Sequence, residues 1–378
     1  MWRKFDHLVV GAGFFGAVLA ERLADHGRRV LVIDRRQHIG GNSWSCRDPQ
    51  TGIEYHPYGP HIFHTSDASV FAYLSRFARL NHYRHRIFTW SRGTRFPFPI
   101  NLEVINRFFG KNLSPDEARL FIAEKCAAET CLRPGNLEEK SISFVGRELY
   151  EAFIKGYTAK QWGREPRLLP AEIITRIPFR YDNSRDYFPA ARWQGIPEEG
   201  YAPIFKRMLG HKNIRIESNI DFHDIKTLIK CRREIIYSGP IDGYFHAALG
   251  PLDWRSVRFI MQRPPVPDYQ EAAVINYADE HIPYTRIHEP RHFHPERNYR
   301  KAQTQTLVIE EYPDENPREP YYPVRTAVNL ARLKNYQALA GREAPHTVFG
   351  GRLGEYAYLD MDKTIASALR CAKSLLAT

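Results

Sequence analysis

The chain has 378 residues, 43% of them hydrophobic, so it can form two or three globular domains with a substantial core. No apolar run approaches the length of about 18 residues that spans a bilayer, and the first residues lead directly into a strand, which predicts a cytoplasmic protein without membrane insertion. The net charge of +11 includes 40 Arg among 54 basic residues but no basic block, so an anionic small molecule fits better than nucleic acid, although ordinary surface arginines explain most of the excess.

A glycine-rich turn follows the first expected strand, Leu8 to Val10, and precedes a helix near Ala17. A second strand, Val30 to Ile33, follows the helix and ends at an acidic residue. The first glycine permits the tight turn, the second lets backbone N–H groups approach a pyrophosphate, and the third allows close packing of helix and strand. The turn therefore predicts a dinucleotide site, and a glycine turn in an ordinary α/β sheet is the alternative. The residues concerned are Gly11, Gly13, Gly16 and, for a ribose hydroxyl, Asp34.

The residues after Asp34 decide between a nicotinamide and a flavin dinucleotide. A nicotinamide enzyme usually continues with another βα repeat, whereas this chain continues with Arg35 and then the glycine loop Gly40, Gly41, Asn42. A second backbone-rich loop suits a larger cofactor, which favours FAD.

The expected secondary structure changes twice in the middle of the chain. A loop rich in aromatic and imidazole groups, residues 55–65, is followed by a strand-rich stretch near residues 87–99 and then by helices from residue 102 to about 163. Ser114, Pro115 and Glu117 predict a helix start with a capping box, and another helix is expected over residues 142–155.

Residues 169–201 are rich in Pro, Tyr and Arg and predict an irregular segment. Helix and strand alternate over residues 201–238, an antiparallel sheet is expected over 252–324, and a strand, a glycine turn and a final helix, 361–376, can return to the first domain. We expect an α/β fold with a Rossmann-like FAD-binding domain (1–80, 201–245 and 325–378). Inserted into it are a helical domain (100–168) and an antiparallel-sheet substrate domain (81–99, 169–200 and 246–324).

Five segments, in the same order along the chain, resemble the bacterial UDP-galactopyranose mutases. They are Gly59–Thr65, Ile154–Gly163, Pro283–Arg286, Tyr321–Pro323 and Gly351–Asp362. The resemblance implies an isomerase that interconverts UDP-galactopyranose and UDP-galactofuranose by covalent catalysis through N5 of reduced FAD, without net oxidation. It also implies a cytoplasmic homodimer that supplies galactofuranose for cell-surface glycans such as lipopolysaccharide.

The resemblance also implies roles for individual residues. Catalytic roles fall to Arg176, Arg286, His61 and His64. Substrate contacts fall to His85, Phe153, Tyr157, Thr158, Trp162, Tyr187, Asn276, Tyr322 and Tyr358. FAD contacts fall to Gly11, Gly13, Phe15, Gly16, Asp34, Arg35, Gly41, Asn42, His61, Ile62, Arg352, Asp360 and Met361.

The chemistry of these residue types supports the assignment. Two guanidinium groups, Arg176 and Arg286, answer the charges of a departing diphosphate, and the segment around Arg176 is expected to be a mobile lid. Phe153 and Tyr157 share a helix face at a spacing of four residues, which by itself suits a core stripe as well as a uridine wall. Where this chain has His85, related enzymes commonly carry an asparagine.

Other chemistries are less well supported by the sequence. His61 and His64 could suggest metal ligands, but partner carboxylates and a third histidine at useful spacing are missing, so no metal is expected. The five cysteines are odd in number and lack a Cys-x-x-Cys pair. An FAD-dependent oxidase of the amine-oxidase type is the main alternative function, and a basic nucleic-acid-binding protein with a vestigial dinucleotide fold is the second.

Overall fold

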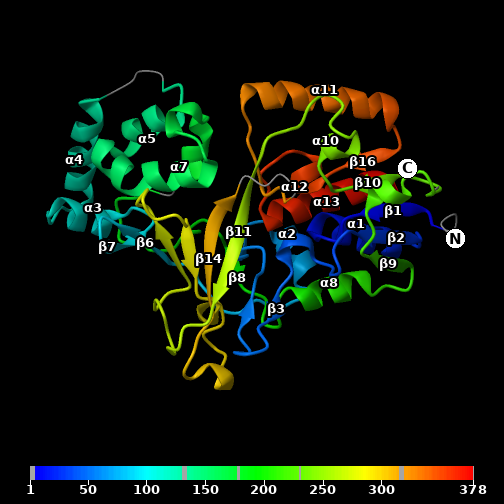
Figure 1. The fold of residues 1–378 in the computed structure, drawn as a ribbon, viewed down its shortest axis with the longest axis horizontal. Helices are drawn as coiled ribbons and strands as arrows, with labels where there is room; N and C mark the ends of the chain where they lie inside the picture. Colours follow the sequence, from blue (N-terminus) through cyan, green and yellow to red (C-terminus); the bar gives the residue numbers. More distant parts are fainter. Residues whose placement is uncertain (1–4, 130–133, 177–178, 230, 315–318, 378) are drawn as a thin grey trace.

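A computed structural model describes residues 5–129, 134–176, 179–229, 231–314 and 319–377, apart from the side chains of residues 175 and 176. Its first layer is a five-stranded parallel sheet, at the right of Figure 1, in the order β16–β10–β1–β2–β9. The two strands β1 and β2 are largely apolar and almost entirely buried, as is typical of parallel strands covered on both faces. The strands are β1 (His7–Val10), β2 (Val30–Asp34), β9 (Ile214–Ser218), β10 (Ile235–Tyr237) and β16 (Thr347–Phe349).

Alternate residues of these strands point into two apolar clusters, one on each face of the sheet. Val9, Val30 and Val32 pack with three helices on one face, whereas Leu8 and Leu31 pack with short helices on the other. The C-terminal helix thus returns to the first domain, as expected. The helices are α1 (Phe14–Asp25), α8 (Ala202–Leu209) and α13 (Met361–Leu376) on the first face, α9 (Phe222–Ile225) and α10 (Ile241–Tyr244) on the second, and α11 (Ala327–Glu343) beyond it.

The second layer is a seven-stranded sheet in the order β15–β11–β14–β13–β12–β6–β7. Its pairs are antiparallel except β6 with β12, which run parallel. Asn276 on β12 lies opposite Arg286 on β13. The strands are β6 (Ile87–Ser91), β7 (Thr94–Phe98), β11 (Trp254–Gln262), β12 (Val274–Tyr277), β13 (Arg286–His288), β14 (Val308–Asp314) and β15 (Tyr322–Pro323).

A helical unit covers the β6–β7 end of this sheet (Figure 1). The capping box at Ser114 and Glu117 is confirmed. The single helix expected over 142–155 is wrong: Gly146, with φ 81° and ψ 159°, interrupts it, and a π-helix follows over Tyr150–Lys155. The helices are α3 (Leu102–Phe109), α4 (Pro115–Ala127), α5 (Leu137–Val145), α6 (Arg147–Leu149) and α7 (Gly156–Trp162).

Short elements connect the two layers. β5 pairs with β8 in antiparallel fashion, and β3 pairs with β4. Residues 171–176, expected to be irregular, form a 3₁₀-helix. The connecting elements are β3 (Cys46–Arg47), β4 (Glu54–Tyr55), β5 (Phe63–Thr65), α2 (Ala68–Leu74), β8 (Trp193–Gly195) and α12 (Gly351–Gly354). This α/β arrangement agrees with the fold class expected from the sequence.

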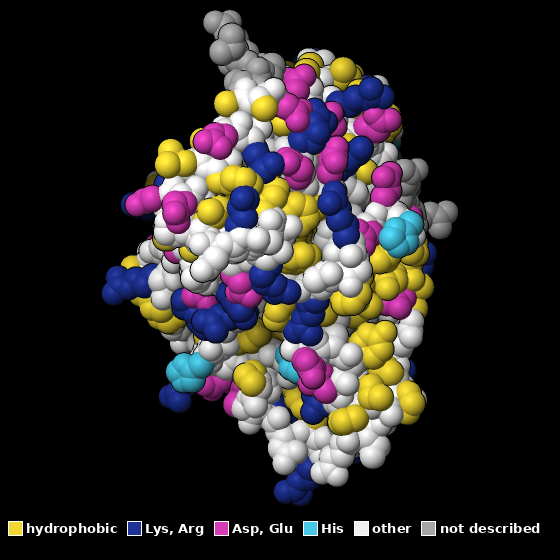
Figure 2. All heavy atoms as spheres, turned by 90° about the vertical axis from the view of Figure 1, so that its left-hand side faces the viewer, with side chains coloured by type: hydrophobic (Ala, Val, Ile, Leu, Met, Phe, Trp, Pro, Cys, Tyr) yellow, Lys and Arg dark blue, Asp and Glu magenta, His cyan; other side chains and the backbone are white. Residues whose placement is uncertain are grey.

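Charges of both signs share the surface. Figure 2 shows Lys and Arg side chains interspersed with Asp and Glu on the side that carries the helical unit. Some of them pair locally: Arg84 and Arg86 each lie 3.0 Å from a carboxylate oxygen of Asp186. Within the described part of the chain, no helix combines the length and apolar character that a membrane span requires.

Candidate active site

The turn between β1 and α1 forms a cradle with little side-chain cover. Gly11 has φ +99°, and a Cβ there would lie 2.1 Å from Ser238 Oγ. A Cβ at Gly16 would lie 2.0 Å from the Gly11 carbonyl oxygen, so the helix can pack on the turn only without it. Gly13 is the N-cap of α1 and supplies no side chain, which leaves the helix N-terminus open to an anion.

A cavity of about 380 Å³ opens from this turn. Most of the predicted cofactor residues line it: Gly11, Gly13, Phe15, Asp34, Arg35, Gly41, Asn42, His61, Arg352 and Met361. Gly16, Ile62 and Asp360 lie beside the cavity and not on its wall. The sequence analysis missed Ser238 and Gly239, which follow β10 and complete the wall, because no motif marks that strand end.

Asp34 ends β2 at the rim of the cavity. Its Oδ2 accepts a hydrogen bond from the Ala12 N–H at 2.8 Å, and its Oδ1 accepts one from the Arg36 N–H at 2.9 Å. A carboxylate has about four acceptor sites, so lone pairs remain for a ribose hydroxyl. The same loop is held by Arg36, whose Nη1 donates to Asn42 Oδ1 at 2.9 Å.

The opposite wall comes from the C-terminal segment. Arg352 donates from Nη2 to the Leu359 carbonyl oxygen at 2.8 Å, and its guanidinium stands 5.0 Å from the ring centre of Tyr358. Tyr358 and Tyr322 are stacked at 5.4 Å with an interplanar angle of 11°. Asp360 holds the N-cap position of α13, yet its side chain caps no backbone N–H. A simple capping role therefore does not account for this carboxylate.

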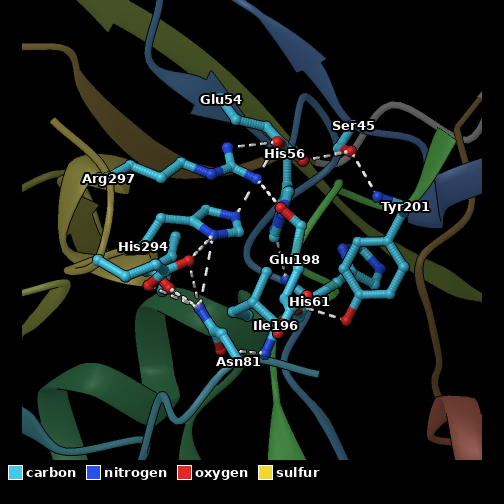
Figure 3. Close-up of polar contacts among 12 residues, drawn as sticks. Ser45, Glu54, His56, His61, Asn81, Ile196, Glu198, Tyr201, His294 and Arg297 are labelled. Carbon is cyan, nitrogen blue, oxygen red and sulfur yellow. Dashed lines mark hydrogen bonds and ion pairs between the residues drawn. The ribbon is translucent and has the colours of Figure 1, made fainter. Parts of the chain in front are cut away.

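His61 is fixed at three atoms (Figure 3). Its backbone N–H donates to His56 Nδ1 at 3.0 Å, and its carbonyl oxygen accepts from Tyr201 Oη at 2.9 Å. Its own Nδ1 lies 2.7 Å from the Gly59 carbonyl oxygen, which requires the proton on Nδ1 and leaves Nε2 as an acceptor. Burial lowers the pKa of His61 to about 4, so the ring is neutral near pH 7.

A buried polar network stands behind His61, and sequence reasoning missed it. Glu54 accepts from Ser45 Oγ at 2.8 Å and from Arg297 Nη1 at 2.7 Å, while Ser45 Oγ accepts the backbone N–H of Tyr201 at 2.8 Å (Figure 3). Burial also holds the pKa of His56 well below its ordinary value. These residues come from distant parts of the chain, and only the fold brings them together.

Arg286 is the central cation on the sheet side of the site. Its Nη2 donates to Tyr157 Oη, and its Nε lies 3.3 Å from Glu311 Oε1. Glu311 is 1% exposed, and burial raises its pKa even though Arg286 acts in the opposite direction. Asn276 is the buried cross-strand neighbour of Arg286. The structure thus brings Arg286, Tyr157 and Asn276 together, with Glu311 as a partner that the sequence analysis did not identify.

Two of the predicted histidines stack on one phenylalanine. The ring centre of His64 lies 3.7 Å from that of Phe188, and the ring centre of His85 lies 5.7 Å from it on a nearly parallel plane. Tyr83 Oη is 2.9 Å from His85 Nδ1, and the Tyr187 N–H donates to the His85 carbonyl oxygen. Burial, with Arg286 nearby, lowers the pKa of His85 to about 3. His85 is therefore a buried, neutral ring beside Phe188.

Other predicted residues are placed differently. Phe153 is 3% exposed and packs edge-on against Phe96, with ring centres 5.2 Å apart, which suits the core-stripe alternative. Thr158 is buried, and Trp162 packs partly against the same core. The backbone of Arg176 ends the 3₁₀-helix, but its side chain lies outside the described part of the structure, so its pairing with Arg286 stays a prediction.

Comparison with known proteins identifies two family models that match this chain. Residues 152–358 match the family model of UDP-galactopyranose mutase, and residues 9–77 match that of the NAD(P)-binding Rossmann-like domain. A Klebsiella pneumoniae protein named "Probable UDP-galactopyranose mutase" is 43% identical over 98% of this chain and 94% of its own. The dTDP-fucopyranose mutase of Escherichia coli is 37% identical over 97% of each chain.

A solved structure, titled as reduced UDP-galactopyranose mutase, shares the fold at a TM-score of 0.77. It is 15% identical and covers 99% of this chain and 96% of its own. The oxidase alternative is less well supported, because the model matched over residues 152–358 is that of the mutase. The chain therefore belongs to the UDP-galactopyranose mutase family of isomerases.

Proposed function

We propose that this protein interconverts UDP-galactopyranose and UDP-galactofuranose with reduced FAD as its cofactor. The observation that carries the proposal is a continuous set of cations and tyrosines between the cofactor cavity and the sheet. Arg352 lines the cavity and stands over Tyr358, which stacks on Tyr322. Tyr322 lies close enough to Arg286 to contribute to raising its pKa. A nucleoside diphosphate lying along this set would place its sugar at the cavity.

The cavity fits FAD, the cofactor of this family. Its floor is backbone: a Cβ at Gly41 would approach Gly13 Cα to 3.1 Å, so the two glycine loops can both face a pyrophosphate. Asp34 would hold a ribose hydroxyl. Arg352 and Met361, on the wall opposite the glycine turn, would contact the part of FAD beyond the pyrophosphate. Reduced FAD supplies a nitrogen nucleophile, N5, which explains why the protein needs no nucleophilic side chain of its own.

The protein's own residues then bind and orient. Arg286 and the hydroxyl groups of Tyr322 and Tyr358 would stabilise the charge that develops on the departing diphosphate. Burial raises the pKa of Tyr322 well above its ordinary value, so this side chain remains a neutral donor. His61, neutral and with Nε2 as an acceptor, can orient a donor at the cofactor without adding charge.

The finer parts of the proposal rest on family membership. The relatives act on different sugar nucleotides by their names, UDP-galactopyranose and dTDP-fucopyranose. We favour the UDP sugar because that relative is more similar over nearly the whole chain. We further propose a cytoplasmic homodimer that supplies galactofuranose for cell-surface glycans such as lipopolysaccharide.

The test is incubation of the dithionite-reduced protein with UDP-galactofuranose, followed by chromatographic separation of the sugar nucleotides. We expect UDP-galactopyranose, with no product from the oxidised protein under air. A parallel incubation with the furanose form of dTDP-fucose decides between the two sugar nucleotides. Peroxide formed in proportion to substrate consumed would show an oxidase and overturn the proposal, as would unchanged sugar nucleotides with reduced, FAD-loaded protein.

A further inference from the structure

Lys160, on α7, is surrounded by backbone carbonyl groups. Its Nζ donates to the carbonyl oxygens of Tyr277 at 2.8 Å, Asp279 at 2.9 Å, Ile282 at 2.9 Å and Tyr284 at 3.1 Å. An ammonium group has three N–H donors, so four acceptors share them and surround the charge. Four carbonyl oxygens around one positive charge also form the kind of shell that can replace the hydration of a monovalent cation.

All four carbonyls belong to one segment, residues 277–284, which joins β12 to β13. Asn276 directly precedes this segment, and Arg286 follows it after one residue. The two side chains are cross-strand neighbours, so the curvature of the segment sets how the strand ends meet. The Lys160 ammonium thus holds the connection between two residues proposed to bind substrate.

The same helix touches the same segment at a second point. A Cβ at Gly156 would lie 2.4 Å from the Ala278 carbonyl oxygen and 3.1 Å from the Glu280 nitrogen. Only glycine lets the α7 backbone approach so closely. Tyr157, the next residue, holds Arg286 through its hydroxyl group. Gly156 and Lys160 therefore dock α7 on the 277–284 segment, and Tyr157 on the same helix contacts Arg286.

Removing the Lys160 ammonium group from water costs free energy unless other polar groups replace its hydration. Burial lowers its pKa to about 8, although Asp279 and Glu280 nearby act to raise it. A buried ammonium is tolerated only when polar groups replace its hydration. The carbonyl groups supply that replacement, and the group stays charged near pH 7.

We propose that Lys160 is a positioning residue, a tethered cation that shapes the 277–284 segment and thereby aligns Arg286 and Asn276 with Tyr157 for nucleotide binding. The proposal deepens the proposed function and rests on it. Its chemical consequence is specific: removing the ammonium should weaken binding of the nucleoside diphosphate more than it disturbs the cofactor domain.

The test compares Lys160→Met, which keeps the apolar stem, with Lys155→Met, which changes an exposed lysine of the adjoining π-helix. Titration of each oxidised holoenzyme with UDP gives the dissociation constant. We expect at least tenfold weaker UDP binding and a raised KM for Lys160→Met, with unchanged FAD content, and no change for Lys155→Met. UDP affinity within twofold of wild type, together with a lowered melting temperature, would show a purely structural lysine and overturn the proposal.

Cation rescue gives a second readout that ordinary destabilisation would not produce. Lys160→Ala leaves the carbonyl groups without their cation, so about 0.1 M potassium or ammonium chloride should restore UDP binding and choline chloride should not. If Lys160→Ala binds UDP with the same affinity in all three salts, Lys160 does not act as a tethered cation.

Hydrogen exchange separates this proposal from the proposed function. Amides of residues 277–284 should exchange at least tenfold faster in Lys160→Met than in wild type, whatever the substrate. If the wild-type protein binds no UDP, the proposed function fails. The hydrogen-exchange rates of residues 277–284 still test the role of Lys160 in that case, and unchanged rates in Lys160→Met would overturn it.

Discussion

Arg286 is a half-buried cation whose charge is balanced by the buried carboxylate of Glu311. Glu311 lies beside its Nε, and Tyr157 accepts from its Nη2, so the guanidinium is held at both ends. For the proposed function, such a group is pre-organised to bind a diphosphate, because little side-chain motion remains to be lost on binding. The same arrangement makes the residue matter for stability, since without it Glu311 loses the guanidinium and keeps the Thr285 hydroxyl group and the His288 ring as neighbours.

Replacing Arg286 therefore separates catalysis from stability. We expect Arg286→Ala to lower turnover at least about a hundredfold, because the departing diphosphate loses its main cation, while FAD stays bound. We also expect about 3 to 5 kcal/mol of lost stability, because the buried carboxylate of Glu311 is left without its cation. The double variant Arg286→Ala/Glu311→Gln should recover much of the stability but none of the turnover. Near-normal turnover in the single variant would remove Arg286 from the diphosphate site.

At the scale of elements, the turn from β1 to α1 depends on glycine for two separate reasons. Gly11 needs both a left-handed backbone and space beside Ser238, whereas Gly52, with φ +70°, needs only the backbone because nothing lies within 4 Å of a Cβ there. Gly52→Ala thus serves as a matched control for Gly11→Ala. Each substitution adds a methyl group at positive φ, at a cost of about 1 to 2 kcal/mol.

We expect Gly11→Ala to purify with at least tenfold less FAD than wild type. The added Cβ must displace Ser238, which lines the cavity and donates from Oγ to the Val10 carbonyl oxygen. Flavin absorbance per protein, with circular dichroism to confirm folding, measures the effect. Gly52→Ala should keep its full FAD content. A folded Gly11→Ala that is as yellow as wild type would show that the turn tolerates the change.

Local signals in the sequence predicted the elements that depend on local chemistry. The glycine turn, the cap at Ser114 and the final helix are of this kind, because their residue types act within a few positions of one another. The break at Gly146 was missed, because the apolar pattern continues through it. The domain boundaries stay a prediction.

Contacts between distant segments explain what the sequence could not predict in the site. His56 and Tyr201 act only because their elements meet at His61, and nothing in their flanking residues marks them. Phe153 shows the opposite case: its spacing from Tyr157 suggested a shared face, but the π-helix between Tyr150 and Lys155 changes the residue period, and Phe153 packs in the core.

At the scale of the whole molecule, a group of histidines is held in the neutral form by a lowered pKa. Burial lowers the pKa of His61 to about 4 and that of His85 to about 3, and it holds the pKa of His56 and His288 well below the ordinary value. They come from both layers and lie close enough to affect one another's charge. The fold keeps all of them neutral.

Stability should therefore fall as the solution becomes mildly acidic. Above pH about 6.5 these histidines are neutral in both the folded and the unfolded states, so their contribution is fully present. Between pH about 6.5 and 4 the unfolded chain takes up protons that the folded chain excludes, and each such histidine lowers the free energy of unfolding by up to about 1.4 kcal/mol per pH unit. His292 opposes the trend among the described histidines, because nearby carboxylates raise its pKa against the effect of burial.

Unfolding titrations of the holoenzyme with guanidinium chloride at pH 7.5, 6 and 5 measure this slope. Asp48, with its pKa lowered to about 2, loses stabilisation only below pH about 4. Glu311, whose pKa is raised by burial, acts in the opposite direction to the histidines as pH falls. We expect a fall of at least about 2 kcal/mol between pH 6 and 5, because two or more histidines must take up protons on unfolding. In His85→Gln the slope should decrease by about one proton, since glutamine keeps a polar group beside Tyr83 but does not titrate. An unfolding free energy that stays constant from pH 7.5 to 5 would mean that water or a conformational change reaches these rings in the folded state and lets them protonate there.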